Sequence, residues 1–490
     1  MNKIHSGGLL DKAAYFRFAE KENAGEQFFL VYNARLIDRD IDTPGALLIQ
    51  DGMISEVYTG INDIASENVR EFAENIGSPG LIDAQGLVIM PSFIDMHVHL
   101  RDPGHTRKED IESASKAAAG GGYGTVVAMA NTEPVISGMT AAQEVNDRAR
   151  KIGFIDVFQA VSVTGNFDGA DTSALATIDP SIVPVVSEDG HEVASAAVML
   201  DAMEKCADTG AIISCHCEDP DLAREAKTFR TAALKTGNKY FADQNPFAEP
   251  GPQSGAAELR LHLAGAGRLL RLAEDSMTAR NLLLAAEAGC RVHIAHVSTA
   301  GSLDEVRQAK RIAAKAGDSR SAKITCEVTP HHIALTDTTA AIVNPPLRTE
   351  VDREALIAGI MDGTVDVIAT DHAPHTSADK ALGTPGFSGI QTSFSVCNTV
   401  LVKSGKISLS ELSGLMSANP AVILALPCGL LKSGYTADIV LLDPDAEWTV
   451  RTDDPAHWFS KGTNTPFAGK VLSGRVISTW KRGKKVYELQ

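Results

Sequence analysis

The sequence predicts an α/β fold: a (β/α)8 TIM-like barrel with a small β-sandwich domain built from both chain ends. Three observations lead to this prediction. Between residues 91 and 430, eight apolar strand candidates alternate with segments of helical character, which is the order typical of a parallel barrel. Strand-rich segments occur near both ends of the chain. No Gly-x-Gly-x-x-Gly loop follows the first central strand, which disfavours an open, doubly wound sheet as the alternative.

The region 26–90 has the pattern of short strands separated by turns, and Asp51-Gly52 is the signal for a hairpin between two of them. A similar strand-rich pattern returns late in the chain, for example in TADIVLLDP at 436–444. We therefore expect residues 26–90 and 431–490 to pair into one composite β-sandwich domain.

The barrel is predicted over residues 91–430. Helical character is clear at 108–122 and 303–317, where Ala, Glu, Lys and Arg dominate. A long connection near 220–273 is predicted as an insertion, with 246–255 as an irregular loop. The eight strand candidates are 93–100, 125–132, 156–164, 183–190, 211–219, 291–299, 324–332 and 366–375.

Composition limits the classes of partner. Hydrophobic residues make up 44% of the 490 residues and charged residues 22%, as in soluble globular proteins. The net charge of −17 comes without any basic block, which argues against nucleic acid and anionic membranes as partners. Seven cysteines without a Cys-x-x-Cys motif indicate free thiols in a reducing compartment. Residues 1–25 form an N-terminal extension without a signal-peptide core, so we expect a cytoplasmic protein.

Residues capable of catalysis or metal binding stand at the end of nearly every strand candidate. His97 and His99 lie two apart, so strand geometry points both imidazoles to one face. Barrel enzymes carry their active sites at the C-terminal ends of the strands, where such side chains converge. Four histidines and two carboxylates at one rim suit a two-metal hydrolytic site. The candidates, in chain order, are His97, His99, Asn131, Asp189, His216, His296, Asp371 and His375.

Other histidines compete for ligand roles. His293 and His296 lie three apart and should face opposite ways on a strand, and we choose His296 because it is nearer the C-terminal end. His331 and His332 could be ligands, but capping and packing are the favoured interpretation. His372 is expected to point away from the site, because it differs in parity from its neighbours at the strand end.

Nine motifs indicate a family. They are HVHLRDPG (97–104), MANTEP (129–134), SEDG (187–190), HCED (216–219), HIAHVST (293–299), VTPHH (328–332), NPPLR (344–348), ATDHAPH (369–375) and NTPFAG (464–469). With these motifs the chain resembles the dihydroorotases of the cyclic amidohydrolase group, within the amidohydrolase superfamily. The resemblance covers roughly residues 40–485.

The resemblance implies two zinc ions per chain. His97 and His99 would hold one ion together with Asp371, and His216 and His296 would hold the other. One branch of the family bridges the metals with a carboxylated lysine and the other with an aspartate. The fourth strand here ends in SEDG without a lysine, so Asp189 and a hydroxide are the implied bridges. Asp371 is the implied catalytic proton carrier.

The resemblance also implies the substrate contacts. Arg101 and Asn131 match residues that hold a substrate carboxylate, with His375 assisting. A guanidinium suits this task because it grips a carboxylate with two hydrogen bonds, and the acidic chain needs such a local cation for an anionic substrate. Asn344 matches the residue that contacts the pyrimidine ring. Pro385 and Gly386 match the segment that closes over it.

The implied reaction is the reversible cyclisation of N-carbamoyl-L-aspartate to L-dihydroorotate, in de novo pyrimidine biosynthesis. Two alternatives remain. One is another cyclic amidohydrolase, such as a hydantoinase, dihydropyrimidinase or allantoinase; Arg101 together with Asp189 disfavours it. The other is a non-catalytic scaffold for a partner, which the intact set of ligands disfavours. The implied partners are a small-molecule substrate, a second copy in a homodimer, and aspartate transcarbamoylase.

Overall fold

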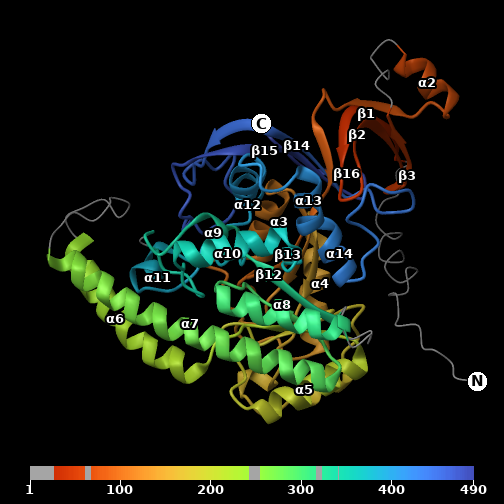
Figure 1. Cartoon of the computed structure of the whole chain (residues 1–490). Coiled ribbons are helices and arrows are strands. Elements are labelled where there is room, and N and C mark those ends of the chain that lie inside the picture. The colour runs from red at the N-terminus through yellow and green to blue at the C-terminus, as the bar shows by residue number, and fades with distance from the viewer. Residues whose placement is uncertain (1–26, 61–67, 242–253, 316–322, 340) are drawn as a thin grey trace, which may run out of the picture.

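The computed structural model describes residues 27–60, 68–241, 254–315, 323–339 and 341–490 (Figure 1). The predicted extension 1–25 lies outside the described residues. Residues 246–253 of the predicted loop also lie outside them. No helix among the described ones combines the length and the apolar composition that crossing a bilayer requires. All seven cysteines are buried and free, in agreement with the prediction of free thiols.

Eight parallel strands form the barrel. Two runs of paired strands, β6 to β8 and β9 to β13, make up its wall. A parallel bridge between Val161 and Val186 joins β8 to β9, and another between Val98 and His372 joins the last strand to the first, so the wall closes. This confirms the predicted barrel and all eight strand candidates. The strands are β6 (Phe93–Val98), β7 (Tyr123–Ala128), β8 (Asp156–Gln159), β9 (Val185–Ser187), β10 (Ile212–Cys215), β11 (Arg291–Ile294), β12 (Ile324–Val328) and β13 (Val367–Ile368).

Helices surround the barrel, and side-chain caps fix where several of them begin. The Asp110 side chain accepts a hydrogen bond from the Ser113 amide at the start of α3, and Thr349 does the same for Asp352 at the start of α10. The helices are α2 (Val69–Asn75), α3 (Ile111–Gly120), α4 (Met139–Ile152), α5 (Ala196–Thr209), α6 (Pro220–Phe241), α7 (Ser254–Ala288), α8 (Ala300–Lys315), α9 (Pro330–Ala334), α10 (Glu350–Met361), α11 (Ser377–Ala381), α12 (Ser393–Cys397), α13 (Leu409–Ser413) and α14 (Asn419–Ile423).

A separate sheet combines strands from both ends of the chain, as predicted. Its strands are β1 (Phe28–Ile37), β2 (Asp42–Gln50), β3 (Met53–Thr59), β4 (Gly80–Asp83), β5 (Val88–Pro91), β14 (Ile439–Thr449), β15 (Val471–Lys481) and β16 (Lys484–Glu488). Antiparallel pairing of β5 with β14 joins the two ends. The predicted hairpin connects β2 and β3. Asp51 and Gly52 both have positive φ there, of 49° and 79°, as a two-residue hairpin turn requires.

The predicted insertion contains two long helices. α6 and α7 run side by side and extend away from the barrel (Figure 1). Ala226 and Phe229 of α6 pack against Ala266 and Leu269 of α7. α6 and α7 thus form a helical hairpin, and residues 242–253, which separate them in the sequence, lie outside the described residues.

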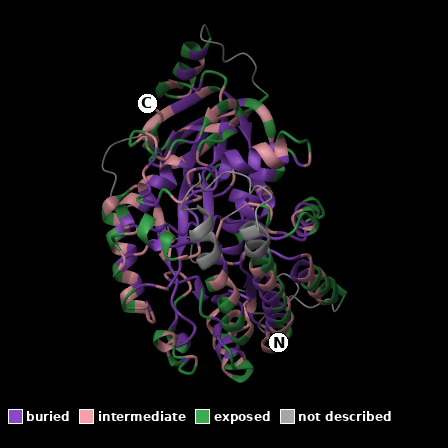
Figure 2. Ribbon diagram, turned by 90° about the vertical axis from the view of Figure 1, so that its left-hand side faces the viewer, coloured by how far each residue is buried: buried purple, intermediate pink, exposed green. Residues whose placement is uncertain are grey.

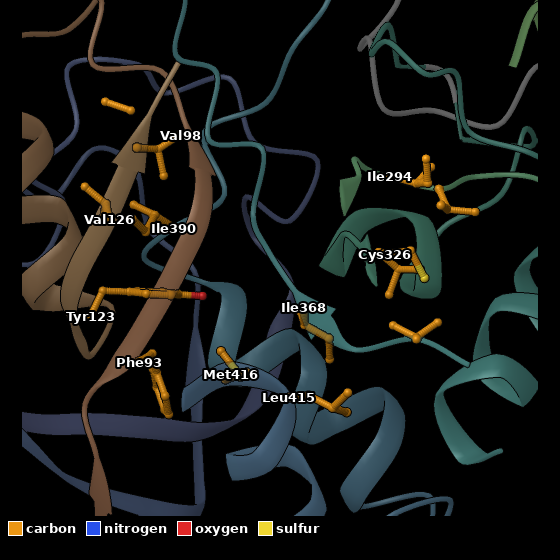
Figure 3. Close-up of a cluster of buried hydrophobic side chains, with 14 of the residues drawn as sticks. Phe93, Val98, Tyr123, Val126, Ile294, Cys326, Ile368, Ile390, Leu415 and Met416 are labelled. Atoms are coloured by element: carbon orange, nitrogen blue, oxygen red, sulfur yellow. The ribbon is translucent and has the colours of Figure 1, made fainter. Parts of the chain in front are cut away.

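Buried residues lie at the centre of the molecule (Figure 2). The largest cluster packs barrel strands against the surrounding helices, with Phe93 and Tyr123 among its bulkiest fully buried members (Figure 3). A second cluster joins Ile94, Val185 and Ile212, from strands on different sides of the barrel, to Leu424. These strand residues stand at the N-terminal ends of their strands, so an apolar plug closes that end and leaves the opposite rim for polar side chains.

Candidate functional site

The six predicted metal ligands converge at the C-terminal rim of the barrel. His97 lies in β6, and the other five follow the ends of β6, β9, β10, β11 and β13. All six are almost fully buried. The ligand atoms of His97, His99 and Asp189 lie within 4.8 Å of one another, and so do those of Asp189, His216 and His296. Two groups of potential ligands therefore share one carboxylate.

Asp189 lies between the two groups. Its Oδ1 is 3.3 Å from His97 Nε2 and 3.3 Å from His216 Nδ1. The same oxygen is 3.6 Å from His296 Nε2, while Oδ2 is 3.5 Å from His99 Nε2. One oxygen or the other thus faces every one of the four histidines. This is the arrangement that a bridging carboxylate needs.

Asp371 stands beside the first pair of histidines. Its Oδ1 accepts a hydrogen bond of 3.0 Å from His99 Nε2 and lies 3.7 Å from His97 Nε2. Burial alone would raise the pKa of Asp371, but the hydrogen bond from His99 and the nearby histidine charges lower it to about 2. The side chain is therefore a carboxylate at neutral pH, able both to bind a cation and to accept a proton.

The donor set fits metal ions. His97 Nε2 is buried and has no hydrogen-bond partner among the described residues. His216 Nδ1 and His296 Nε2 are hydrogen-bonded to each other at 2.8 Å, and His216 Nε2 is buried without a hydrogen-bond partner in the described part of the chain. Buried polar atoms in such positions cost free energy unless a ligand engages them. Imidazole nitrogens with carboxylate oxygens suit zinc and other divalent transition metals.

Glu327, which is not among the predicted site residues, contacts two of the predicted histidine ligands, one on the side away from Asp189 and the other through the backbone. It is fully buried on β12. His97 Nδ1 donates a 2.8 Å hydrogen bond to its Oε1, and His293 Nε2 approaches Oε2 at 3.0 Å. The His296 amide also donates to Oε1, at 3.2 Å. Metal-binding histidines commonly give their second nitrogen to such a carboxylate, which fixes tautomer and ring orientation. His293 belongs to this supporting layer.

The other competing histidines also lie outside the two ligand groups. His332 contacts the Thr329 hydroxyl at 2.8 Å and the Pro345 carbonyl at 3.1 Å, in keeping with a capping and packing role. His331 packs its ring against Phe387. His372 Nδ1 accepts a hydrogen bond from the Gly389 amide.

Arg101 and His375 form a polar pair near Asp371 and Asp189. The Arg101 guanidinium donates a 3.2 Å hydrogen bond to His375 Nε2. Burial and the neighbouring Arg101 charge lower the pKa of His375 to about 3, so the imidazole is neutral at pH 7. Arg101 Nε and His375 Nδ1 are both buried without a hydrogen-bond partner in the described part of the chain. Two buried donors without a partner, on residues that are hydrogen-bonded to each other, are suited to an anion.

Asn131 contacts two of the predicted ligands. Its Oδ1 is 2.9 Å from His99 Nδ1, and its amide donates to Asp189 Oδ2 at 3.1 Å. In this structure the side chain holds two predicted ligands in place. Its predicted contact with a substrate carboxylate stays a prediction.

The remaining predicted substrate contacts come from two neighbouring loops. Asn344 donates a 3.0 Å hydrogen bond to Glu218 Oε1. Pro385 and Gly386 follow α11, and the Gly386 amide bonds to the Ile342 carbonyl at 3.2 Å. Gly386 has a φ of 134°, and a Cβ added there would lie 2.8 Å from Ala373. Only glycine allows this close approach.

Three site residues that are not glycine adopt left-handed backbone conformations. The φ angles are 58° at Arg101, 32° at His296 and 48° at Asp371. Such conformations cost of order 1–3 kcal/mol each and concentrate at functional sites. They are independent support for the rim as the working part of the molecule.

Comparison with known proteins identifies the class. The model of the amidohydrolase family matches residues 88–486, so the chain belongs to this family of hydrolases. Membership implies a metal cofactor, in agreement with the two ligand groups.

Among individual relatives, the chain is similar to curated dihydroorotases. A dihydroorotase of Clostridium botulinum (strain Eklund 17B / Type B) is 38% identical over 461 residues, which cover 94% of this chain and 99% of the relative. A dihydroorotase of Thermoanaerobacter sp. (strain X514) is 39% identical over 420 residues, covering 83% and 88%. Among solved structures, the L-hydantoinase of Arthrobacter aurescens has a TM-score of 0.74 at 23% identity and covers 94% of this chain and 96% of that one. This last likeness supports the fold alone.

Proposed function

We propose that the protein is a zinc-dependent dihydroorotase, which catalyses the reversible cyclisation of N-carbamoyl-L-aspartate to L-dihydroorotate in de novo pyrimidine biosynthesis. The observation that carries the proposal is the Arg101–His375 pair beside the Asp189-centred ligand groups. Both compounds bear a carboxylate, and this pair offers donors for one. Curated relatives named dihydroorotase, 38% and 39% identical, support the same activity.

Two zinc ions are proposed to bind per chain. His97, His99 and Asp371 would hold one, His216 and His296 the other, and Asp189 would bridge them. When bound, the ions supply Lewis-acid polarisation of a carbonyl and activation of water. An intrinsic aspartate bridge needs no prior modification of a lysine.

Asp371 is proposed to carry the proton of the reaction. As a carboxylate held by His99, at 3.0 Å, it can accept a proton from the attacking water during ring opening. It then passes this proton to the departing ring nitrogen, and the reverse transfer serves ring closure. General acid–base transfer of this kind contributes roughly 10²–10⁴-fold to a rate.

Arg101 and His375 are proposed to bind the substrate carboxylate. His375 is neutral and accepts from Arg101 at Nε2, so its proton sits on Nδ1, where it can donate to an anion. Burial lowers the pKa of Arg101 only to about 10, which leaves it charged at neutral pH. A charge-assisted grip in a buried site discriminates strongly against a ring without a carboxylate.

The test is hydrolysis of a substrate panel by zinc-loaded protein: L-dihydroorotate, dihydrouracil, hydantoin and allantoin, with chelator-treated protein as the control. We expect metal-dependent turnover confined to dihydroorotate. Preference for an uncharged ring would overturn the substrate assignment and favour another cyclic amidohydrolase. Zinc binding without turnover of any compound would favour the non-catalytic scaffold.

The domain limits and the assembly are further proposals. We propose a composite β-sandwich domain over 26–90 and 431–490, a barrel over 91–430 and an extension over 1–25. The joint sheet from the two chain ends supports the first of these. A cytoplasmic homodimer, and association with aspartate transcarbamoylase, follow from the resemblance. Light scattering of the purified protein, with and without that enzyme, tests both.

A further inference from the structure

The segment that carries Asn344 is held by both helices of the α6–α7 hairpin. Arg348, at the end of this segment, points into α7. It donates hydrogen bonds to the carbonyls of Gly267 and Leu270, at 3.1 and 3.2 Å, and pairs with Glu274 at 3.0 Å. Arg348 and Glu274 are both almost fully buried. The C-terminal side of the segment is thus fixed to α7.

The other side of the segment is fixed to α6. Arg230, near the middle of that helix, donates to the Val343 carbonyl at 3.3 Å and to Asn344 Oδ1 at 3.1 Å. Both bonds come from Nη2, which can make them at once because it carries two N–H groups. The insertion therefore reaches the backbone and the side chain of the same short loop.

Arg230 also completes the environment of the Asn344 amide. With Oδ1 engaged by Arg230, the amide nitrogen donates to Glu218 Oε1 at 3.0 Å. The second oxygen of Glu218 lies 3.6 Å from His216 Nε2. Both the oxygen and the nitrogen of the Asn344 amide thus have partners. The contacts lead from Arg230 on α6 to His216, one of the predicted metal ligands.

We propose that Arg230 is a positioning residue, through which the hairpin holds Asn344 in the orientation that the substrate ring meets. The inference rests on the proposed function only in taking Asn344 as a substrate contact. Arg230 itself need not touch substrate. The hairpin thereby belongs to the substrate pocket, although most of its length extends beyond the barrel.

The experiment compares Arg230→Ala, Arg230→Lys and Arg224→Ala in the zinc-loaded, full-length protein. Arg224 is the matched control, because it lies on the same helix, its side chain is 73% exposed, and among the described residues its ion pair is with Asp221, three residues away. We expect Arg230→Ala to raise KM about 10-fold or more with a smaller change in kcat. Arg230→Lys should recover part of the loss, and Arg224→Ala should match the wild type.

A readout independent of activity is amide hydrogen exchange. Arg230→Ala should accelerate exchange in peptides covering 341–347, while barrel-strand peptides stay protected. In an Asn344→Ala background, Arg230→Ala should add little to KM, because coupled residues are not additive. Unchanged KM and unchanged exchange in Arg230→Ala would overturn the proposal, as would full additivity with Asn344→Ala.

The outcomes separate this inference from the proposed function. If the wild type hydrolyses a ring other than dihydroorotate, the substrate assignment fails, and the same variants are then compared on that ring. If Arg230→Ala unfolds, which its melting temperature reports, Arg230→Lys provides the comparison. Wild-type KM and wild-type amide exchange in Arg230→Lys would then refute the positioning role.

Discussion

Replacing Glu327 by glutamine tests the supporting layer of the metal site. Glu327 accepts hydrogen bonds from His97 Nδ1, at 2.8 Å, and from the His296 amide, at 3.2 Å. A glutamine Oε1 can keep both bonds. Its amide nitrogen would then face His293 Nε2, which can accept when the proton of that ring sits on Nδ1. The Thr325 hydroxyl oxygen, 2.8 Å from Nδ1, can accept a hydrogen bond from this N–H. The substitution therefore removes a charge and preserves shape.

The expected magnitude follows from what is lost. Mutating the partner behind a metal-binding histidine typically costs 10–100-fold in metal affinity, or about 1.4–2.7 kcal/mol. Because the hydrogen bonds can be kept, we expect Glu327→Gln to melt close to the wild type. Glu327→Leu should lower both the metal affinity and the melting temperature further than Glu327→Gln does. It leaves the donors of His97 and His296 unpaired in the core, at about 1–3 kcal/mol each.

Zinc affinity is measured by competition with a chromophoric chelator, and folding by thermal melting of the same samples. Glu204→Gln is the control, because Glu204 is exposed on α5. It removes the same charge far from the supporting layer and should leave affinity unchanged. Wild-type zinc affinity in a folded Glu327→Gln would refute the reasoning that this carboxylate strengthens His97 as a ligand.

Three further predictions test the pocket, the proton carrier and the hairpin anchor. Arg101→Ala should raise KM for dihydroorotate by at least about 10-fold without loss of zinc. Arg101→Lys should recover little of this loss, because lysine lacks the planar fork of donors. Unchanged kinetics would contradict the role of Arg101 in substrate binding. Asp371→Asn should lower kcat by roughly 10²–10⁴-fold or more, and a near-normal rate would exclude the proton role. Arg348→Met leaves the buried Glu274 without its cation, so urea unfolding should show a loss of about 3–5 kcal/mol. Wild-type stability would contradict a stabilising buried ion pair.

The barrel could be predicted because its strands are short apolar runs that end in chemistry-bearing residues. Strand parity predicted that His97 and His99 face the same way, and the structure places both beside Asp189. Strand parity also predicted that the side chains of His293 and His296 point in different directions. In the structure His293 contacts Glu327, and His296 lies in a ligand group with Asp189. These inferences depend only on alternation within one strand, which is a local property of the sequence.

The supporting residues could not be predicted in the same way. Glu327 is a lone carboxylate inside an apolar strand, and its partners are supplied by β6 and β11. Arg230 lies on a helix of ordinary composition, and its partner is more than a hundred residues away. Whether such residues meet depends on how strands and helices that are distant in the sequence align and pack against each other. A buried carboxylate in a strand is the one signal available, because it must have a partner.

The residues that sequence reasoning missed are also those that hold the strained backbone of the site. Glu327 accepts from the amide of His296 itself, whose φ is 32°. Asp95, fully buried on β6, accepts from the Thr370 amide at 3.0 Å, next to Asp371 with its φ of 48°. A strained conformation persists only where its surroundings determine it. Glu327 and Asp95 thus hold the backbone at His296 and next to Asp371, two predicted ligands that lie on different sides of Asp189. This explains why the rim needs both carboxylates although neither belongs to the ligand groups.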